Sequence, residues 1–422
     1  MEKVKQKLTY KSKRVLQYAA SFLKWVFIAL LTGAIGGAVG GAFRFCVQFV
    51  TQVRTTHEFL IYFLPLAGLV IVLLYKVTKL TEEADTNLVL KSVRENVQVP
   101  LLLAPVIFMS TVITHLFGGS VGKEGAALQL GGCLGKQVGS LFHLDDTDMH
   151  VAALCGMSGL FSALFSTPVT ATIFVMEVIS VGVFYYSAFI PCIVSAIVSL
   201  TVTNLMGLEN EIYVLYNTPD VSLTSVIMVA PVAIACAGFG ILFCLMLRLS
   251  KKLSKKYFKN EYLRIFVGGV VIVLLTIFIG TRYSGVGSDV IHSALEYEKI
   301  YWYDPLLKIL FTSLAIGFGF KGGEIVPTLF IGATLGYTVG SLVGLDPAFA
   351  AAIGMVSLFC SVVNCPIASI ILSVELFKGG SIVLFAVAVG ISFMLSGYYG
   401  LYHGQKILYS KRRARFVDRY AK

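Results

Sequence analysis

The sequence repeats itself, and this repeat limits the folds that the chain can adopt. The segment GMSGLFSALFSTPVTATIFVMEV at 156–178 recurs as GMVSLFCSVVNCPIASIILSVEL at 354–376, with the Gly-Met pair, the proline and the glutamate at identical spacing. Upstream, VGSL at 138–141 recurs at 339–342, and a glycine-rich run with a glutamate precedes each copy. Because these matches come in the same order, we expect two halves of the chain to share one fold.

A weaker pair extends the repeat further upstream, with ADTNLVL at 84–90 against VGSDVIH at 286–292. The matches together predict the domain organisation of the chain. We expect a basic segment at 1–19, a first membrane half at 20–208, a connection at 209–221, a second membrane half at 222–400, and a C-terminal helix with a basic tail at 401–422.

Composition places both halves in a membrane. Of the 422 residues, 57% are hydrophobic and only 14% are charged, unlike a soluble domain. Glycines and prolines fall inside the apolar runs, and several runs are shorter than the ~20 residues that a helical span needs. Irregular backbone at membrane depth must be buried or line a cavity, so the pattern predicts an all-α polytopic fold with broken and re-entrant helices. Repeats of this kind are typical of transporters.

The net charge of +11 is concentrated beside the apolar runs, in clusters at 3–14, 251–264 and 406–419. Basic residues that flank membrane spans mark the cytoplasmic side, so these clusters indicate topology and not a nucleic-acid partner. We therefore predict a multi-pass protein of the plasma (inner) membrane with both termini in the cytoplasm.

The cysteines and histidines do not predict a cofactor or a metal. The eight cysteines lie singly apart from Cys360 and Cys365, and the six histidines are scattered without the spacing of zinc ligands. Ser120 in GGSVG loosely resembles the nucleophile of a hydrolase, but no strand precedes it. We expect no enzymatic activity and no cofactor.

The run GGSVGKEGAALQLGG at 118–132 predicts an anion site. Its glycines allow tight turns and close approach to backbone amides, and AALQL then resumes a helical pattern. The run therefore delivers a helix N-terminus, whose unpaired N–H groups and partial positive charge bind anions. The same holds for GGEIVP at 322–327, where Pro327 suits a first helical turn. Two such helix ends aimed at one point would bind an ion without a full positive charge.

Glu124 and Glu324 each allow two interpretations. As an ionised carboxylate at an anion site, either residue can compete with the anion and carry a proton when it leaves. Alternatively, each carboxylate only neutralises the dipole of its helix. Glu177 and Glu375 lie at equivalent positions near the ends of apolar runs, where capping or pairing is favoured over transport.

These motifs resemble the CLC family of chloride channels and proton-coupled anion antiporters. GKEGA is similar to the family's GREGP, GGEIVP to its GxFxP, and both a proline-containing helix that ends in Glu177 and a tyrosine near the C-terminus have counterparts there. The resemblance covers nearly all of residues 20–410. It implies two inverted halves per subunit, a homodimer, and halide anions and protons as the partners besides lipid.

The resemblance also assigns site residues. Glu124 matches the gating glutamate. Its neighbours in the same motif, Gly122, Lys123, Gly125 and Ala126, are assigned to anion binding. Ile325 and Val326 stand where the family's second motif lines the anion site with backbone amides. Tyr402 best matches the tyrosine whose hydroxyl reaches the central anion, with Tyr409 as the alternative, and Thr86 and Asn87 stand where the family has GSGIP.

Departures from the motifs favour one branch of the family. Val178 replaces the internal proton glutamate of chloride antiporters, whereas Glu324 and the TNL sequence are similar to the fluoride/proton antiporter branch. That branch commonly has hydroxyl side chains where this chain has Ala126 and Val326. The resemblance implies a fluoride/proton antiporter in which Glu124 and Glu324 gate and transfer protons. The alternatives are a passive chloride channel and a chloride/proton antiporter with an altered proton path.

Overall fold

The computed structural model describes residues 2–81, 85–95, 97, 99–208, 210, 212–413 and 415–422. Ala84 of the weaker repeat and Glu209 of the connection lie outside the described residues. Sixteen α-helices carry the fold within the described part, and strands are short. The predicted all-α class is confirmed.

Two successive sets of eight helices follow one another along the chain, and corresponding members have similar positions relative to the repeated motifs. The first set is α1 (Glu2–Thr56), α2 (Leu64–Val77), α3 (Thr86–Glu95), α4 (Leu103–Leu116), α5 (Glu124–Leu141), α6 (Asp146–Phe165), α7 (Pro168–Val178) and α8 (Phe189–Leu205). The second set is α9 (Leu223–Tyr257), α10 (Glu261–Ile279), α11 (Ser288–Leu295), α12 (Asp304–Phe318), α13 (Ile325–Val343), α14 (Pro347–Val363), α15 (Pro366–Leu376) and α16 (Ile382–Leu395). Short 3₁₀ helices lie at Glu58–Phe63, Tyr186–Ala188 and Thr281–Tyr283.

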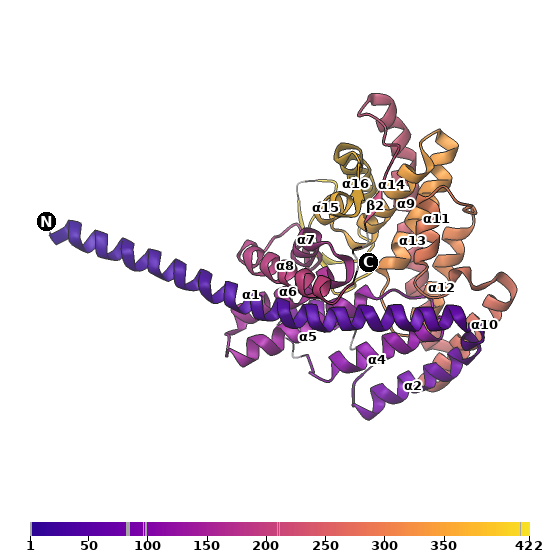
Figure 1. Ribbon diagram of the computed structural model, residues 1–422, viewed down its shortest axis with the longest axis horizontal. Helices are drawn as coiled ribbons and strands as arrows, with labels where there is room; N and C mark the ends of the chain where they lie inside the picture. The colour runs from indigo at the N-terminus through magenta and orange to yellow at the C-terminus, as the bar shows by residue number, and fades with distance from the viewer. Residues whose placement is uncertain are drawn as a thin grey trace.

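Seven of the described helical segments are long and apolar enough to cross a membrane. Others, such as α7 and α15, are apolar but have only 11 residues each, so they cannot span a bilayer alone. This mixture agrees with the broken helices predicted from the interrupted apolar runs. α1 begins at Glu2, so the predicted basic segment is helical and continuous with the first span, and its N-terminal part projects away from the rest of the molecule (Figure 1).

The repeated Gly-Met motif allows two helices to pack closely in each half. A Cβ atom added at Gly156 of α6 would lie 2.0 Å from the carbonyl oxygen of Gly131 in α5. The equivalent atom at Gly354 of α14 would lie 2.1 Å from the carbonyl oxygen of Gly332 in α13. Only glycine permits this approach, because any side chain would separate the backbones.

The repeated proline motif follows a helix end in both halves. Ser166 follows the end of α6 and Asn364 follows the end of α14, each in the left-handed conformation with a φ of 59°. Pro168 and Pro366 then begin α7 and α15, where the missing N–H group would have no helical partner. The identical spacing in the sequence therefore encodes the same unit twice, namely two consecutive helices joined by a short turn.

The predicted C-terminal helix at 401–422 is wrong. The tail contains β4 (Lys406–Tyr409) and β5 (Phe416–Tyr420), which pair antiparallel, while β4 also pairs parallel with β1 (Ser180–Val181). Side chains in β4 alternate in burial, with Ile407 buried between more exposed neighbours, which is a strand pattern. The backbone of β1 supplies the pairing edge that the sequence did not reveal. A second pair joins β2 (Tyr213–Val214) to β3 (Phe377–Lys378).

Candidate functional site

The two glycine-rich runs meet at the centre of the candidate site. Gly122 and Gly323 exchange two backbone hydrogen bonds, each with a nitrogen–oxygen distance of 2.6 Å. This bridge directly precedes α5 in the first half and α13 in the second half. The predicted convergence of two helix N-termini is therefore observed.

The side chain of Glu124, the first residue of α5, extends to the N-terminus of α13 in the other half. Its side chain is fully buried, and its Oε2 atom accepts a hydrogen bond from the backbone nitrogen of Val326 at 3.3 Å. A Cβ atom added at Gly122 would lie 2.4 Å from the same oxygen, so the carboxylate folds over the glycine. Because Ile325 and Val326 form the first turn of α13, the carboxylate occupies the positive end of that helix.

Glu324 holds the position in the second half that Lys123 holds in the first. Each residue directly follows the bridging glycine and is the N-cap residue of its helix. The Glu324 Oε2 atom is buried without a hydrogen-bond partner among the described residues. That oxygen lies 3.4 Å from the position of a Cβ atom on Gly125, next to the start of α5. Each half thus directs one carboxylate at the first turn of the other half's helix.

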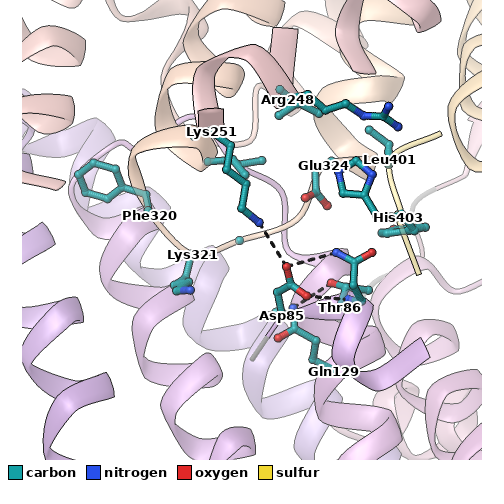
Figure 2. A pocket seen from close by; sticks show the side chains of 18 of the residues that line it. Asp85, Thr86, Gln129, Arg248, Lys251, Phe320, Lys321, Glu324, Leu401 and His403 are labelled. Atoms are coloured by element: carbon teal, nitrogen blue, oxygen red, sulfur yellow. Dashed lines mark hydrogen bonds and ion pairs between the residues drawn. The ribbon is translucent and has the colours of Figure 1, made fainter. Parts of the chain in front are cut away.

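A cavity of about 130 Å³ lies against Glu324 on one side of the bridge. Residues from both halves line it, as Figure 2 shows for many of them. They include five predicted site residues, Thr86, Asn87, Ala126, Glu324 and Tyr402. The structure therefore brings together residues that are more than 300 positions apart in the sequence.

Basic side chains surround this cavity and were not predicted as site residues. The cavity is lined by one acidic side chain besides Glu324, that of Asp85, and by five lysine or arginine side chains, Arg248, Lys251, Lys255, Arg264 and Lys321. Lys251 Nζ lies 3.6 Å from Asp85 Oδ2 (Figure 2). The excess of positive charge attracts anions to the cavity. The basic cluster of the sequence was the available signal, but it was assigned only to topology.

His403 lines the cavity beside these basic side chains. Burial lowers the pKa of its imidazole below the usual value, and the neighbouring cations Arg248 and Lys251 lower it further. Figure 2 shows His403 among the side chains that line the cavity. The lowered pKa favours the neutral form of the ring, so His403 adds less positive charge to the cavity than the lysine and arginine side chains do.

Thr86 and Asn87 connect the cavity to two other elements. Gln129 Nε2 donates to Thr86 Oγ1 at 2.9 Å, and the Thr86 hydroxyl lies 3.4 Å from the carbonyl oxygen of Gly125. Asn87 Oδ1 accepts from the backbone nitrogen of Gly404 at 2.9 Å. Gln129 was missed by the sequence reasoning, although a polar residue in the apolar run AALQLGG was a visible signal.

Tyr402 and Tyr409 have different environments. Tyr402 is 2% exposed, lines the cavity, and has a hydroxyl group without a hydrogen-bond partner among the described residues. Tyr409 is 49% exposed on β4 and packs against Phe416, with ring centroids 5.6 Å apart. Tyr402 therefore lines the cavity, whereas Tyr409 lies outside it.

A second, larger cavity of about 690 Å³ contains Lys123, Arg54 and Arg282 in its lining. Ala126, three residues after Lys123, lines the first cavity instead. Glu124 lies between these two residues in the chain and lines neither cavity. Along the chain, the buried carboxylate thus lies between a residue that lines the larger cavity and a residue that lines the smaller one. No group of three or more His, Cys, Asp or Glu side chains could hold a metal ion in the described part of the chain.

Glu177 and Glu375 cap helices reciprocally across the two halves. Glu177 accepts from the backbone nitrogens of Ile367 and Ala368 at 3.3 and 2.9 Å, at the start of α15. Glu375 accepts from those of Val169 and Thr170 at 2.9 and 2.7 Å, at the start of α7. The capping role favoured by the sequence is confirmed for both residues.

These features define a class of protein, namely a polytopic α-helical membrane protein built from a repeat, in which two helix N-termini meet at a buried carboxylate. Residues 67–397 match the family described as voltage gated chloride channel, which covers most of the chain. A chloride/fluoride channel protein of Pseudomonas syringae pv. tomato is 34% identical over 396 residues, covering 92% of this chain and 87% of the relative. The chain belongs to the CLC family.

Solved structures agree with this assignment. The structure of a CLC-type fluoride/proton antiporter superposes with a TM-score of 0.88 at 31% sequence identity, covering 91% of this chain and 98% of the other. The structure of a slow cyanobacterial Cl⁻/H⁺ antiporter has a TM-score of 0.75 at 18% identity, covering 88% and 94% of the two chains. The second likeness concerns the fold alone.

Proposed function

We propose that the chain is a fluoride/proton antiporter. The observation that carries this proposal is the position of the Glu124 carboxylate at the backbone nitrogen of Val326, where an anion would bind. A carboxylate held there excludes the transported anion, and its protonation releases the site. The similarity to a relative named a chloride/fluoride channel protein and to a structure of a fluoride/proton antiporter supports the choice of ion.

The residues divide into two roles in this proposal. Glu124 exchanges between the anion site and a protonated position towards the larger cavity, and Glu324 passes the proton to and from the smaller one. The anion is bound by the helix N-termini and by polar groups at the cavity end, where buried donors replace its hydration shell. The anion-binding residues are Gly122, Lys123, Gly125, Ala126, Ile325, Val326, Thr86, Asn87 and Tyr402.

The proposal includes a topology. The smaller cavity opens to the cytoplasm, because the basic residues at 251–264 border it and positive charge marks the cytoplasmic side. Both termini are then cytoplasmic, in a plasma (inner) membrane protein whose halves are 20–208 and 222–400. The functional unit is a homodimer with one site in each subunit, and the chain has no catalytic activity.

A passive chloride channel is the second candidate, and two side chains favour it. Val178 is a fully buried apolar residue where chloride antiporters carry a proton-transferring glutamate, and Val326 offers no hydroxyl group at the anion site. A chloride/proton antiporter would need another proton path for the same reason.

Reconstitution into liposomes tests the proposal. Purified protein is given an outward fluoride or chloride gradient, and internal pH is followed with a trapped dye. An antiporter moves protons inward as fluoride leaves. Anion flux without proton movement would identify a channel, and preferred transport of chloride would reject fluoride as the substrate.

A further inference from the structure

The position of the Tyr402 hydroxyl must be set from the backbone. The side chain is buried, yet the hydroxyl has no hydrogen-bond partner among the described residues that could fix it. Tyr402 lies in the loop at 399–405, between α16 and β4. Whatever holds this loop therefore determines where the hydroxyl points in the cavity.

Gln405 connects this loop through hydrogen bonds to one helix of each half. Its side chain is fully buried, and its Nε2 atom donates to the carbonyl oxygens of Val178 at 3.0 Å and Val363 at 2.8 Å. These are the last residues of α7 and α14, whose carbonyl groups have no partner within their own helices. Gln405 Oε1 in turn accepts from Asn364 Nδ2 at 2.9 Å. Both donor hydrogens and the acceptor of this amide are used, which fixes its orientation.

Asn364 extends the connection to the C-terminal tail. Its Nδ2 atom also donates to the carbonyl oxygen of Tyr399 at 3.0 Å, at the start of the loop. Its Oδ1 atom accepts from the ammonium group of Lys411, which donates to Ser396 Oγ at 3.0 Å as well. Asn364 has a left-handed backbone and lies directly after the end of α14. Its side-chain amide therefore links α14 to the loop at 399–405 and to Lys411 of the C-terminal tail.

The last residues of the chain pair with the same loop. The backbone nitrogen of Gly400 donates to the carbonyl oxygen of Lys422 at 2.9 Å, and that of Ala421 donates to the carbonyl oxygen of Gln405 at 3.0 Å. The two residues that follow β5 thus form backbone hydrogen bonds to this loop. The loop is held on one side by buried amides and on the other by the terminal strand.

We propose that Gln405, oriented by Asn364 and braced by the C-terminal hairpin, is a positioning residue that places the Tyr402 hydroxyl at the anion site. This inference rests on the proposed function, because it assumes that the cavity at Tyr402 binds the anion. Gln405 touches no anion and acts only through Tyr402. Small displacements of a positioned group are costly, so loss of the amide weakens anion binding.

A double-mutant cycle tests this role. The dissociation constant for fluoride is measured by isothermal titration of the purified full-length protein with sodium fluoride, for the wild type, Q405M, Y402F and the double variant. Q405M is expected to weaken binding about tenfold in the wild-type background and less than twofold in the Y402F background. T276V, which removes a buried hydrogen bond within α10, is the control and leaves binding unchanged. Monodisperse elution in detergent verifies folding.

An equal loss in both backgrounds would overturn the inference, because Gln405 would then act independently of the tyrosine. A change below twofold in the wild-type background would overturn it as well. If Q405M does not fold, Q405N keeps an uncharged amide that is one methylene shorter, and it is carried through the same cycle. Absence of fluoride transport in liposomes would reject the proposed function, independently of the positioning role. In that case the same double-mutant cycle is measured with sodium chloride, and it decides whether Gln405 positions Tyr402.

Discussion

The Glu124 Oε2 atom lies 3.3 Å from the backbone nitrogen of Val326, so a carboxylate of the first half occupies the helix N-terminus of the second half. The Gly122–Gly323 bridge makes this reach possible, because it brings the starts of α5 and α13 together. Conversely, the Glu324 carboxylate of the second half lies next to the start of α5 in the first half. The repeat therefore brings two helix N-termini together, and one carboxylate from each half crosses to the other half's helix, although Glu124 and Glu324 stand one position apart in the repeat.

Replacing Glu324 with glutamine should uncouple protons from fluoride. The amide has nearly the same shape as the carboxylic acid but cannot take up and release a proton, so fluoride transport should continue with proton movement lost. Simultaneous recording of fluoride release and internal pH in liposomes measures the ratio. E296Q, at an exposed loop position, serves as the matched control. An unchanged proton-to-fluoride ratio in E324Q would remove this residue from the proton path.

Much of this arrangement was predictable from the sequence, because the repeat fixed which segments correspond. The glycine runs predicted two helix N-termini, and the spacing from Pro168 to Glu177 predicted a unit that recurs at Pro366. Lys251 and Gln129 were not predicted as site residues, because their contacts depend on packing between segments far apart in the chain. The C-terminal hairpin was missed because its partner, β1, lies more than 200 residues upstream.

The helix caps at Glu177 and Glu375 should both stabilise the fold, and the buried Glu177 should do so more strongly. Each carboxylate accepts two backbone hydrogen bonds, whereas a glutamine has one acceptor oxygen and would turn an amide donor towards the second N–H group. E177Q and E375Q are each expected to cost about 1–3 kcal/mol. Thermal denaturation in detergent checks this, again with E296Q as control. A loss confined to one variant would contradict the reciprocal role.

Removing the hydroxyl of Tyr402 should weaken anion binding. A hydrogen bond to an anion is lost in Y402F, which predicts a rise in the dissociation constant of roughly 10- to 150-fold, for about 1.5–3 kcal/mol. Y409F is the matched control, because Tyr409 lies outside the cavity. Titration with sodium fluoride gives both values. Unchanged or tighter binding in Y402F would mean that the hydroxyl does not contact the anion.

The most direct test of the account is proton movement in liposomes that carry Glu124→Gln. The wild type, given an outward fluoride gradient, should drive protons inward as fluoride leaves. The amide of E124Q has no ionised form, so it cannot compete with the anion and then carry a proton away. Fluoride should leave the E124Q liposomes without any change in internal pH, and proton uptake that persists in this variant would contradict the account.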